Sequence, residues 1–227
     1  MTKVFALLSR RPDVSAERFH EHWRTVHREH ALRIRRLRGY VQAHRIDPDL
    51  PGLPAAPYEG IAQVWFDDVH SALAQRDDPD YLRYAKLDEP EFIDTATISR
   101  IVANQEMVAG TADDSGVKAM ILIGGADKAP DALAADAKAF GNRLSELCPH
   151  ASGVGLAIAL PPSSPAGPSP YDAVAEIWWD ARAAQEADWA AGRETVPQAI
   201  GRVGDPERSV ALLCEELRVI WPPGGRR

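Results

Sequence analysis

Four of the seven histidines of this chain lie close together, in a pattern that could support proton transfer. They are His20, His22, His27 and His30. Histidine changes its charge near neutral pH, so an imidazole beside a cavity can take up and return a proton. A helical wheel at about 100° per residue places His30 in the middle of an apolar stripe and His27 on its edge. The stripe contains Phe19, Trp23, Val26, Ile34 and Leu37.

Two other roles are open to these histidines. Both could be buried structural residues with hydrogen-bond partners, since an unpartnered buried polar group costs about 1–3 kcal/mol. His27 and His30 are also one helical turn apart and could supply two ligands to a metal. A third ligand would have to come from elsewhere, such as His44, an Asp or a Glu. No cysteine or carboxylate stands at a spacing typical of a metal site, so the metal signal is weak. The helical wheel leaves both the structural role and acid–base chemistry open for His27 and His30, and a metal is the weakest of the three alternatives.

The chain contains an internal repeat that organises the elements around this segment. The stretch Tyr58–Asp67 matches Tyr171–Asp180 at an offset of 113 residues, with Tyr, Ala, Trp and Asp identical. The same shift places residues 4–8 over 117–121, and the proline-rich residues 48–57 over 161–170. A tandem duplication explains all three matches. We expect one unit at residues 1–110 and a second at 117–221, joined by a small, polar linker at 109–116.

Each half has the same predicted order of elements, β-α-β-β-α-β, which is the ferredoxin-like unit. The first half has predicted strands at 3–9, 40–46, 59–67 and 99–108, with helices at about 17–38 and 69–85. The second has strands at 117–123, 153–160, 172–180 and 209–220, with helical segments at 131–147 and 181–200. The prediction is an α+β protein in which the sheets of the two units pack against each other.

The second copy keeps the strands but loses the histidine chemistry. At the same offset, His27 becomes Phe140 and His30 becomes Arg143. This difference favours one working pocket per chain, supported by a second half that serves as scaffold.

Composition excludes several classes of protein. The formal net charge is −7, from 26 Lys and Arg against 33 Asp and Glu, so a nucleic-acid or anionic-membrane partner is not expected. The N-terminal apolar run is shorter than a secretory or membrane-spanning segment requires. Cys148 and Cys214 are too few for a disulfide framework. We therefore expect a cytoplasmic protein.

The first 108 residues resemble the EthD family. The resemblance lies in Arg10–Ser15, the helix pattern Phe19-x-x-x-Trp23-x-x-x-His27, and the strands Gly39–His44 and Tyr58–Asp67. It implies a dimeric α+β barrel, which this chain could complete alone. The superfamily includes cofactor-independent polyketide cyclases, muconolactone isomerases and small monooxygenases, as well as haem enzymes. In many of them the ligand lies between the sheet and its helices, which would place His27 beside a pocket.

The predicted function is a cofactor-independent lyase, isomerase or cyclase that acts on a small hydrophobic molecule, aromatic or polyketide-like. His27 would move a proton next to a carbonyl, with His30 as the second catalytic candidate. The candidate substrate-binding residues are Trp23, Tyr40, His44, Tyr58 and Trp65. The alternatives are a non-catalytic binding or accessory module, and a haem or metal oxidoreductase with a helix histidine as ligand. A homodimer, beyond the pairing of the two halves, is a further possibility.

Overall fold

Eight antiparallel strands close into a barrel in the computed structural model, which describes residues 1–48, 50–112, 116–160 and 169–221. Around the barrel the strand order is β1-β3-β2-β8-β5-β7-β6-β4. The strands of the first half are β1 (Thr2–Leu8), β2 (Gly39–Arg45), β3 (Gly60–Phe66) and β4 (Ser99–Gly110). Those of the second half are β5 (Val117–Ile123), β6 (Gly153–Ala159), β7 (Ala173–Trp179) and β8 (Val210–Ile220).

The two halves have the same sheet topology. The first half runs β4-β1-β3-β2 across its sheet, and the second runs β8-β5-β7-β6, so equivalent strands occupy equivalent places. The halves join through two antiparallel pairings, β2 with β8 and β4 with β6. Each junction therefore pairs the second strand of one half with the last strand of the other. The predicted fold class is confirmed: two ferredoxin-like units form a dimeric α+β barrel within one chain.

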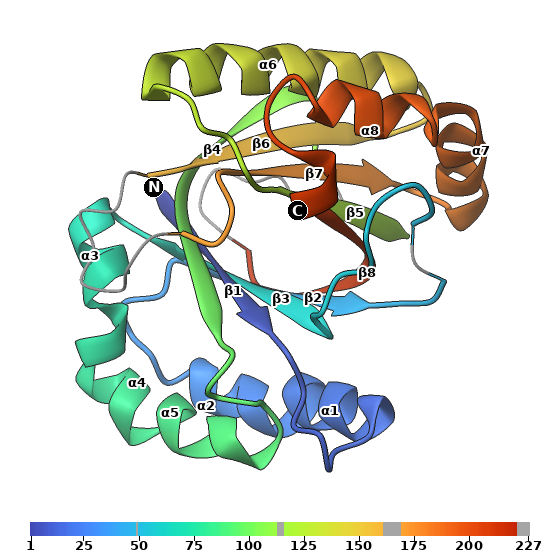
Figure 1. Ribbon diagram of the computed structural model, residues 1–227. Coiled ribbons are helices and arrows are strands. Elements are labelled where there is room, and N and C mark those ends of the chain that lie inside the picture. Colours follow the sequence, from blue (N-terminus) through green and yellow to red (C-terminus); the bar gives the residue numbers. More distant parts are fainter. Residues whose placement is uncertain (49, 113–115, 161–168, 222–227) are drawn as a thin grey trace.

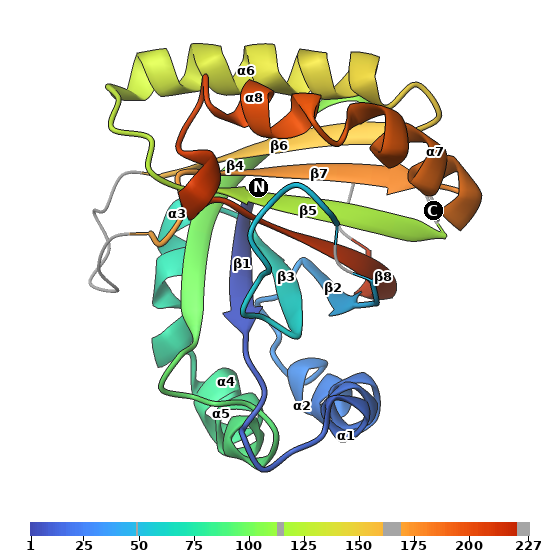
Figure 2. The ribbon, with the colours of Figure 1, turned by 45° about the vertical axis from the view of Figure 1, so that its right-hand side comes forward.

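Helices cover the outside of the barrel in two separate groups (Figures 1 and 2). The first group consists of α1 (Ala16–His22), the π-helix η1 (Trp23–His27), α2 (Arg28–Ala31), α3 (Val69–Leu73), η2 (Ala74–Asp77), α4 (Pro79–Arg83), α5 (Ala85–Asp88) and η3 (Glu89–Glu91). The second group consists of α6 (Pro130–Leu147), α7 (Arg182–Gly192), α8 (Thr195–Ile200) and η4 (Pro206–Arg208). None of the helices in the described ranges is long and apolar enough to cross a membrane.

Strand alternation divides the side chains between the barrel interior and the helix-covered outside. On β1, Phe5 and Leu7 belong to the core inside the barrel, whereas Val4 and Leu8 belong to the cores beneath the helices. Successive residues of a strand point to opposite faces, so every strand contributes to both regions. The protein therefore has two distinct places where a cavity can form, inside the barrel and between sheet and helices.

The first helix contains a π turn that changes which residues it buries. Burial recurs at every fourth residue, at Phe19, Trp23, His27 and Ala31, while Val26 is 44% exposed. A π-helix places more residues in each turn than an α-helix. The helical wheel at about 100° per residue was therefore wrong to place Val26 in the buried stripe. It also placed His30 in the middle of that stripe, whereas the His30 side chain is partly exposed. The helix also ends at Ala31 and not near Arg38.

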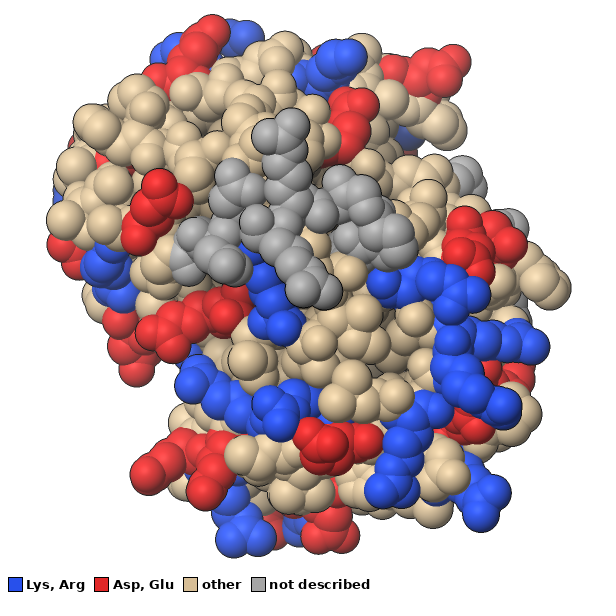
Figure 3. Space-filling model, turned by 180° about the vertical axis from the view of Figure 1, so that it is seen from behind, with Lys and Arg blue, Asp and Glu red and all other residues tan. Residues whose placement is uncertain are grey.

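Charged side chains of both signs cover the surface. On the face seen from behind, Lys and Arg gather in the lower half with Asp and Glu between them (Figure 3). Three arginines that follow the first helix are paired in this way: Arg35 with Asp80, Arg36 with Asp78 and Arg38 with Asp67. The arginines are exposed, whereas Asp78 is buried. Ion pairs with an exposed partner contribute little to stability, and these three offset the charge of the arginines.

Candidate active site

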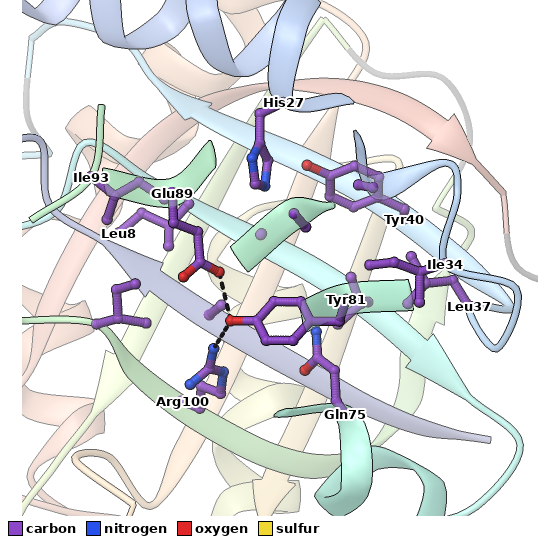
Figure 4. A pocket seen from close by; sticks show the side chains of 16 residues that line it. Leu8, His27, Ile34, Leu37, Tyr40, Gln75, Tyr81, Glu89, Ile93 and Arg100 are labelled. Carbon is purple, nitrogen blue, oxygen red and sulfur yellow. Dashed lines mark hydrogen bonds between the residues drawn. The ribbon is translucent and has the colours of Figure 1, made fainter. Parts of the chain in front are cut away.

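A small pocket lies between the sheet of the first half and its helices. Its volume is about 50 Å³, and His27, Tyr40, Tyr81, Glu89 and Arg100 bring polar groups to it (Figure 4). The remaining walls are mostly apolar: Ala6, Leu8, Ala31, Ile34, Leu37, Ala62, Val64, Ala85, Ile93 and Ile98, with Gln75 beside them. Arg100 reaches this side because β4 pairs it with Ala6 of β1, another residue that lines the pocket.

His27 is held by a carboxylate that lies far away in the sequence. Its Nδ1 lies 2.9 Å from Oδ2 of Asp88, at the end of α5, and Nε2 of His22 lies 2.9 Å from Oδ1 of the same carboxylate. Burial alone would raise the pKa of Asp88, but the hydrogen bonds from His27 and His22 outweigh it and hold the pKa below its usual range. An ionised Asp88 accepts the Nδ1–H of His27, which leaves the lone pair of a neutral imidazole on Nε2.

Tyr40 presents its hydroxyl group beside His27. The oxygen accepts hydrogen bonds from Nε1 of Trp23, at 3.1 Å, and from Nε2 of Gln42, at 2.8 Å. With both lone pairs occupied, the hydroxyl can still donate its own hydrogen. Burial raises the pKa of Tyr40 to about 12, so this hydrogen stays in place at neutral pH. Figure 4 shows the hydroxyl end of Tyr40 directed toward the His27 ring.

The opposite wall carries a hydrogen-bonded chain of three polar residues. The hydroxyl of Tyr81 donates to Oε1 of Glu89 at 2.7 Å and accepts from a terminal nitrogen of Arg100 at 3.4 Å (Figure 4). Lys86 also bonds to Glu89, at 3.0 Å. The Nε atom of Arg100 is buried and has no hydrogen-bond partner in the structure. Arg100 therefore retains donor capacity beside the pocket.

The structure brings together some of the predicted site residues and separates others. His27 and Tyr40 line the pocket, and Trp23 is fixed behind Tyr40 by its hydrogen bond. His30 is more exposed, with its Nε2 4.0 Å from Asp88. Tyr58 belongs to the core inside the barrel, and Trp65 lines a second cavity there. Trp65 is on β3, where strand alternation places it on the other face of the sheet from His27, and Tyr58 lies just before that strand.

His44 lies behind Trp23 and outside the pocket lining. Its Nε2 is 2.9 Å from Oε1 of Gln42, and its Nδ1 is 2.9 Å from Nδ1 of His20. Its ring packs against Trp23 with centroids 4.3 Å apart. Burial is the main reason that the pKa of His44 falls to about 2. His44 is thus a neutral residue that supports the wall behind the pocket.

In the second half, apolar side chains occupy the region that corresponds to this pocket. Phe140, which takes the place of His27, is buried in a large apolar core together with Leu144, Trp179 and Trp189. Phe140 thus contributes to an apolar core at the position where His27 brings a polar group to the pocket of the first half. The polar pocket belongs to the first half.

The residues present do not favour a metal or a haem. Within the described ranges, no group of three or more His, Cys, Asp or Glu side chains could hold a metal ion. A haem is far larger than the present volume of about 50 Å³ and, like any large ligand, would require side chains of the pocket to move.

Sequence reasoning missed Asp88, Tyr81, Glu89 and Arg100. Asp88 and Glu89 stand in a segment of ordinary helical composition, 61 and 62 residues after His27, with no spacing motif to mark them. The sequence did contain a signal for the burial pattern of the first helix. Phe19, Trp23, His27 and Ala31 are spaced by four residues, and this spacing fits a helix with a π turn better than a regular α-helix.

Comparisons with known proteins agree with this architecture. Residues 11–96 match the EthD domain family. The anthrone oxidase-like protein is structurally similar over 96% of this chain and 92% of its own, with a TM-score of 0.63 and 11% identity. A mutant chlorite dismutase from Candidatus Nitrospira defluvii, in complex with cyanide, is similar over 96% and 91%, with a TM-score of 0.52 and 10% identity. No curated protein matches in sequence. The match to the EthD domain family thus lies within the first half of this chain, and the two halves together have the fold of a dimeric α+β barrel.

Proposed function

We propose that this protein is a cofactor-independent enzyme that moves a proton next to the carbonyl group of a small hydrophobic molecule, as a lyase, isomerase or cyclase. The observation that carries the proposal is the pairing of His27 with Asp88 at a pocket that also contains the hydroxyl group of Tyr40. A base, a group that orients it and a neighbouring donor are the parts that such a reaction needs.

The first step follows from the arrangement of these groups. The lone pair on Nε2 of His27 removes a proton from the carbon next to the carbonyl. The electron pair of the broken C–H bond forms a carbon–carbon double bond, and the carbonyl π electrons move to the oxygen, giving an enolate. Tyr40 donates its hydrogen bond to that oxygen, and Asp88 stabilises the imidazolium.

The second step depends on where the proton goes. Its return from His27 to a different carbon completes an isomerisation, and expulsion of a leaving group from the neighbouring carbon completes an elimination. Attack of the enolate carbon on a second carbonyl of the same molecule closes a ring. Arg100, held by Tyr81, supplies positive charge on the opposite wall for a second oxygen of the substrate.

The pocket suggests the class of substrate. Its walls are largely apolar and its polar groups are few, which suits a ketone on a hydrocarbon or aromatic frame. A molecule larger than the cavity can enter only if side chains such as the half-exposed Gln75 move. The name of the anthrone oxidase-like relative agrees with this class, because anthrone is an aromatic ketone with acidic hydrogens.

Hydrogen–deuterium exchange tests the proposal without knowledge of the natural substrate. The protein is incubated in D₂O with cyclopentanone, 2-indanone or anthrone, and NMR follows the loss of the α-hydrogen signal. We expect exchange above the buffer rate with at least one ketone, and a fall of about 10²-fold or more in the variant His27→Gln. His30→Gln is the matched control, because His30 lies on the same helix but makes no short bond to Asp88.

The same experiment separates catalysis from binding. A ketone that binds, as detected by saturation-transfer NMR, but exchanges only at the buffer rate would contradict the proposal and favour a binding or accessory module. Equal exchange by wild type and His27→Gln would show that His27 is not the base.

A further inference from the structure

A second cavity lies inside the barrel, on the other face of the sheet from His27, with a volume of about 140 Å³. Its lining comes from both halves of the chain: Lys3, Gln63, Trp65, Gln105, Met107, Ala112, Trp178, Glu216 and Trp221. Lys3 is almost completely buried, whereas Met107 is 42% exposed. The cavity thus reaches from a buried amine to a partly exposed side chain, and the proposed proton-transfer chemistry uses none of these residues.

The amine of Lys3 is held at this cavity by a carboxylate and an amide. Its Nζ lies 2.7 Å from Oε2 of Glu176 and 3.0 Å from Oε1 of Gln105. It also lies over the rings of Phe5 and Trp65, 4.4 Å and 4.6 Å from their centroids. A buried lysine amine beside a cavity is the kind of group that forms imines with carbonyl compounds.

Lys118, another buried lysine of the barrel, interacts with more carboxylate groups than Lys3 does. It pairs with Glu176 and, at 2.7 Å, with Glu216. The carboxylate of Glu216 lines the cavity, and it accepts hydrogen bonds from Lys118 and Arg218. Two carboxylates thus hold Lys118 as an ammonium ion, whereas Lys3 pairs with Glu176, which it shares with Lys118.

Two N–H groups of the lining are available to a carbonyl oxygen. Nε2 of Gln63 and Nε1 of Trp178 are buried and have no hydrogen-bond partner among the described residues. Gln63 lies diagonally across from Lys3, because β3 pairs Trp65 with Lys3 and residues two apart share a face. Since an unpartnered buried donor costs about 1–3 kcal/mol, the site favours a ligand that brings an acceptor oxygen.

We propose that Lys3 forms an imine with a small aldehyde or ketone inside the barrel. A cavity of about 150 Å³ can hold a benzene-sized molecule, so the ligand has a short chain or a single ring. The indole rings of Trp65, Trp178 and Trp221 provide apolar surface for its carbon frame. This site is separate from the pocket of His27, and the assignment does not depend on the chemistry proposed there.

The protons of this reaction can pass through Glu176. The ammonium group of Lys3 gives a proton to the carboxylate, and the nitrogen lone pair attacks the carbonyl carbon, so that the carbonyl π electrons move to the oxygen. The oxygen takes that proton from Glu176, and a second proton follows the same route from the nitrogen. The oxygen then leaves as water while the nitrogen lone pair completes the C=N bond. The iminium ion has the same charge as the ammonium ion it replaces, so the pairing with Glu176 is kept.

The protonation of Lys3 sets the conditions for the experiment. Burial lowers the pKa of Lys3 to about 7, and it outweighs the attraction of Glu176 and Glu216, while the charge of Lys118 lowers the pKa further. An exposed lysine has a pKa of about 10.4. At pH 7 about half of the Lys3 amine is therefore unprotonated, whereas an exposed lysine is almost fully protonated.

Reductive trapping tests the assignment. The protein is incubated at pH 7 with propionaldehyde or cyclopentanone and sodium cyanoborohydride, which reduces an imine to a stable amine. Mass spectrometry of peptides follows each lysine, and fragmentation separates Lys3 from the α-amino group of Met1. We expect modification of Lys3 to be about tenfold faster, or more, than modification of the exposed Lys138 or of Lys118 in the same sample.

Variants connect the reaction to this cavity. Lys3→Arg keeps the positive charge but has no nucleophilic amine, so the fast modification is lost in a protein whose thermal unfolding shows that it is folded. Trp178→Phe removes one donor from the lining and slows the modification of Lys3 about tenfold. Trp189→Phe is the matched control, because its N–H group donates to the backbone oxygen of Pro51 and its loss leaves the rate unchanged.

Two results would overturn this assignment. One is modification of Lys3 no faster than that of Lys138. The other is an equal rate at Lys3 in the folded protein and in protein unfolded by guanidinium chloride, because neither the cavity nor its charged groups would then contribute. The variant His27→Gln keeps the fast modification of Lys3, so a failure of the acid–base proposal is distinguished from a failure of this one.

Discussion

Tyr58 and Tyr171, which stand at equivalent positions in the two halves of the sequence, meet inside the barrel with their hydroxyl oxygens 3.3 Å apart. Their rings lie edge to face, with centroids 6.4 Å apart. Equivalent residues can meet in this way only near an axis that relates the two halves. The contact therefore lies near the pseudo-symmetry axis that relates the two halves.

This contact predicts a non-additive pair of substitutions. Tyr58→Phe and Tyr171→Phe should each lower the free energy of unfolding by about 1–3 kcal/mol, because each leaves the other hydroxyl buried without its partner. The double variant should cost less than the sum of the two single changes. Urea denaturation of the four proteins measures the cycle. Strict additivity would show that the two hydroxyl groups do not interact.

The bond between His27 and Asp88 predicts the effect of neutralising the carboxylate. Asp88→Asn should lower the rate of α-hydrogen exchange about 10²-fold or more, because the amide no longer fixes the tautomer or stabilises the imidazolium. His22→Asn removes the other histidine partner of Asp88 and leaves the His27 bond in place, so it should lower the rate far less. The comparison is made at saturating ketone. A larger loss in His22→Asn than in Asp88→Asn would contradict the assigned roles.

Gly60 lies so close to Trp23, behind the pocket, that any side chain at this position should clash with the indole ring. A Cβ atom at this position would lie 2.5 Å from Cζ3 of Trp23 and 2.6 Å from the backbone oxygen of Ala43. Trp23 is fully buried and cannot move aside freely, so Gly60→Ala should destabilise the protein by about 1–3 kcal/mol. Gly192→Ala in α7 is the control, since its Cβ would meet nothing closer than 3.7 Å. Chemical denaturation gives both values, and equal stability of the two variants would contradict the packing argument.

The low pKa of the buried His44 predicts that the folded protein loses stability in acid. Its pKa is about 2 in the folded state, against about 6.5 for an unperturbed histidine, so between these values the unfolded chain binds a proton that the folded chain does not. Stability should therefore fall as the pH drops below about 6.5, by about 1.4 kcal/mol per pH unit from this residue. The variant His44→Gln should show a shallower fall between about pH 6 and pH 4. Identical pH profiles for wild type and variant would rule out this contribution.

The sequence alone predicted the architecture, and it singled out His27 as a candidate for the site. The 113-residue repeat and the alternation of apolar residues predicted both the eight strands and the pairing of two ferredoxin-like units, because these signals are local and recur at fixed spacing. The Phe19, Trp23 and His27 pattern marked the helix that covers the pocket. The expected boundaries of β1 to β8 differ from the observed ones by two residues or fewer.

Only the tertiary structure decided which residues accompany His27. Asp88 and Arg100 reach the pocket through the path of the chain and the pairing of β4 with β1, which no local pattern records. The tertiary structure also decided which face of each strand lies beneath the helices and which lies inside the barrel. Trp65 was a candidate partner of His27 in the sequence, yet it lines the cavity inside the barrel, because alternation defines two faces without saying which one the helices cover.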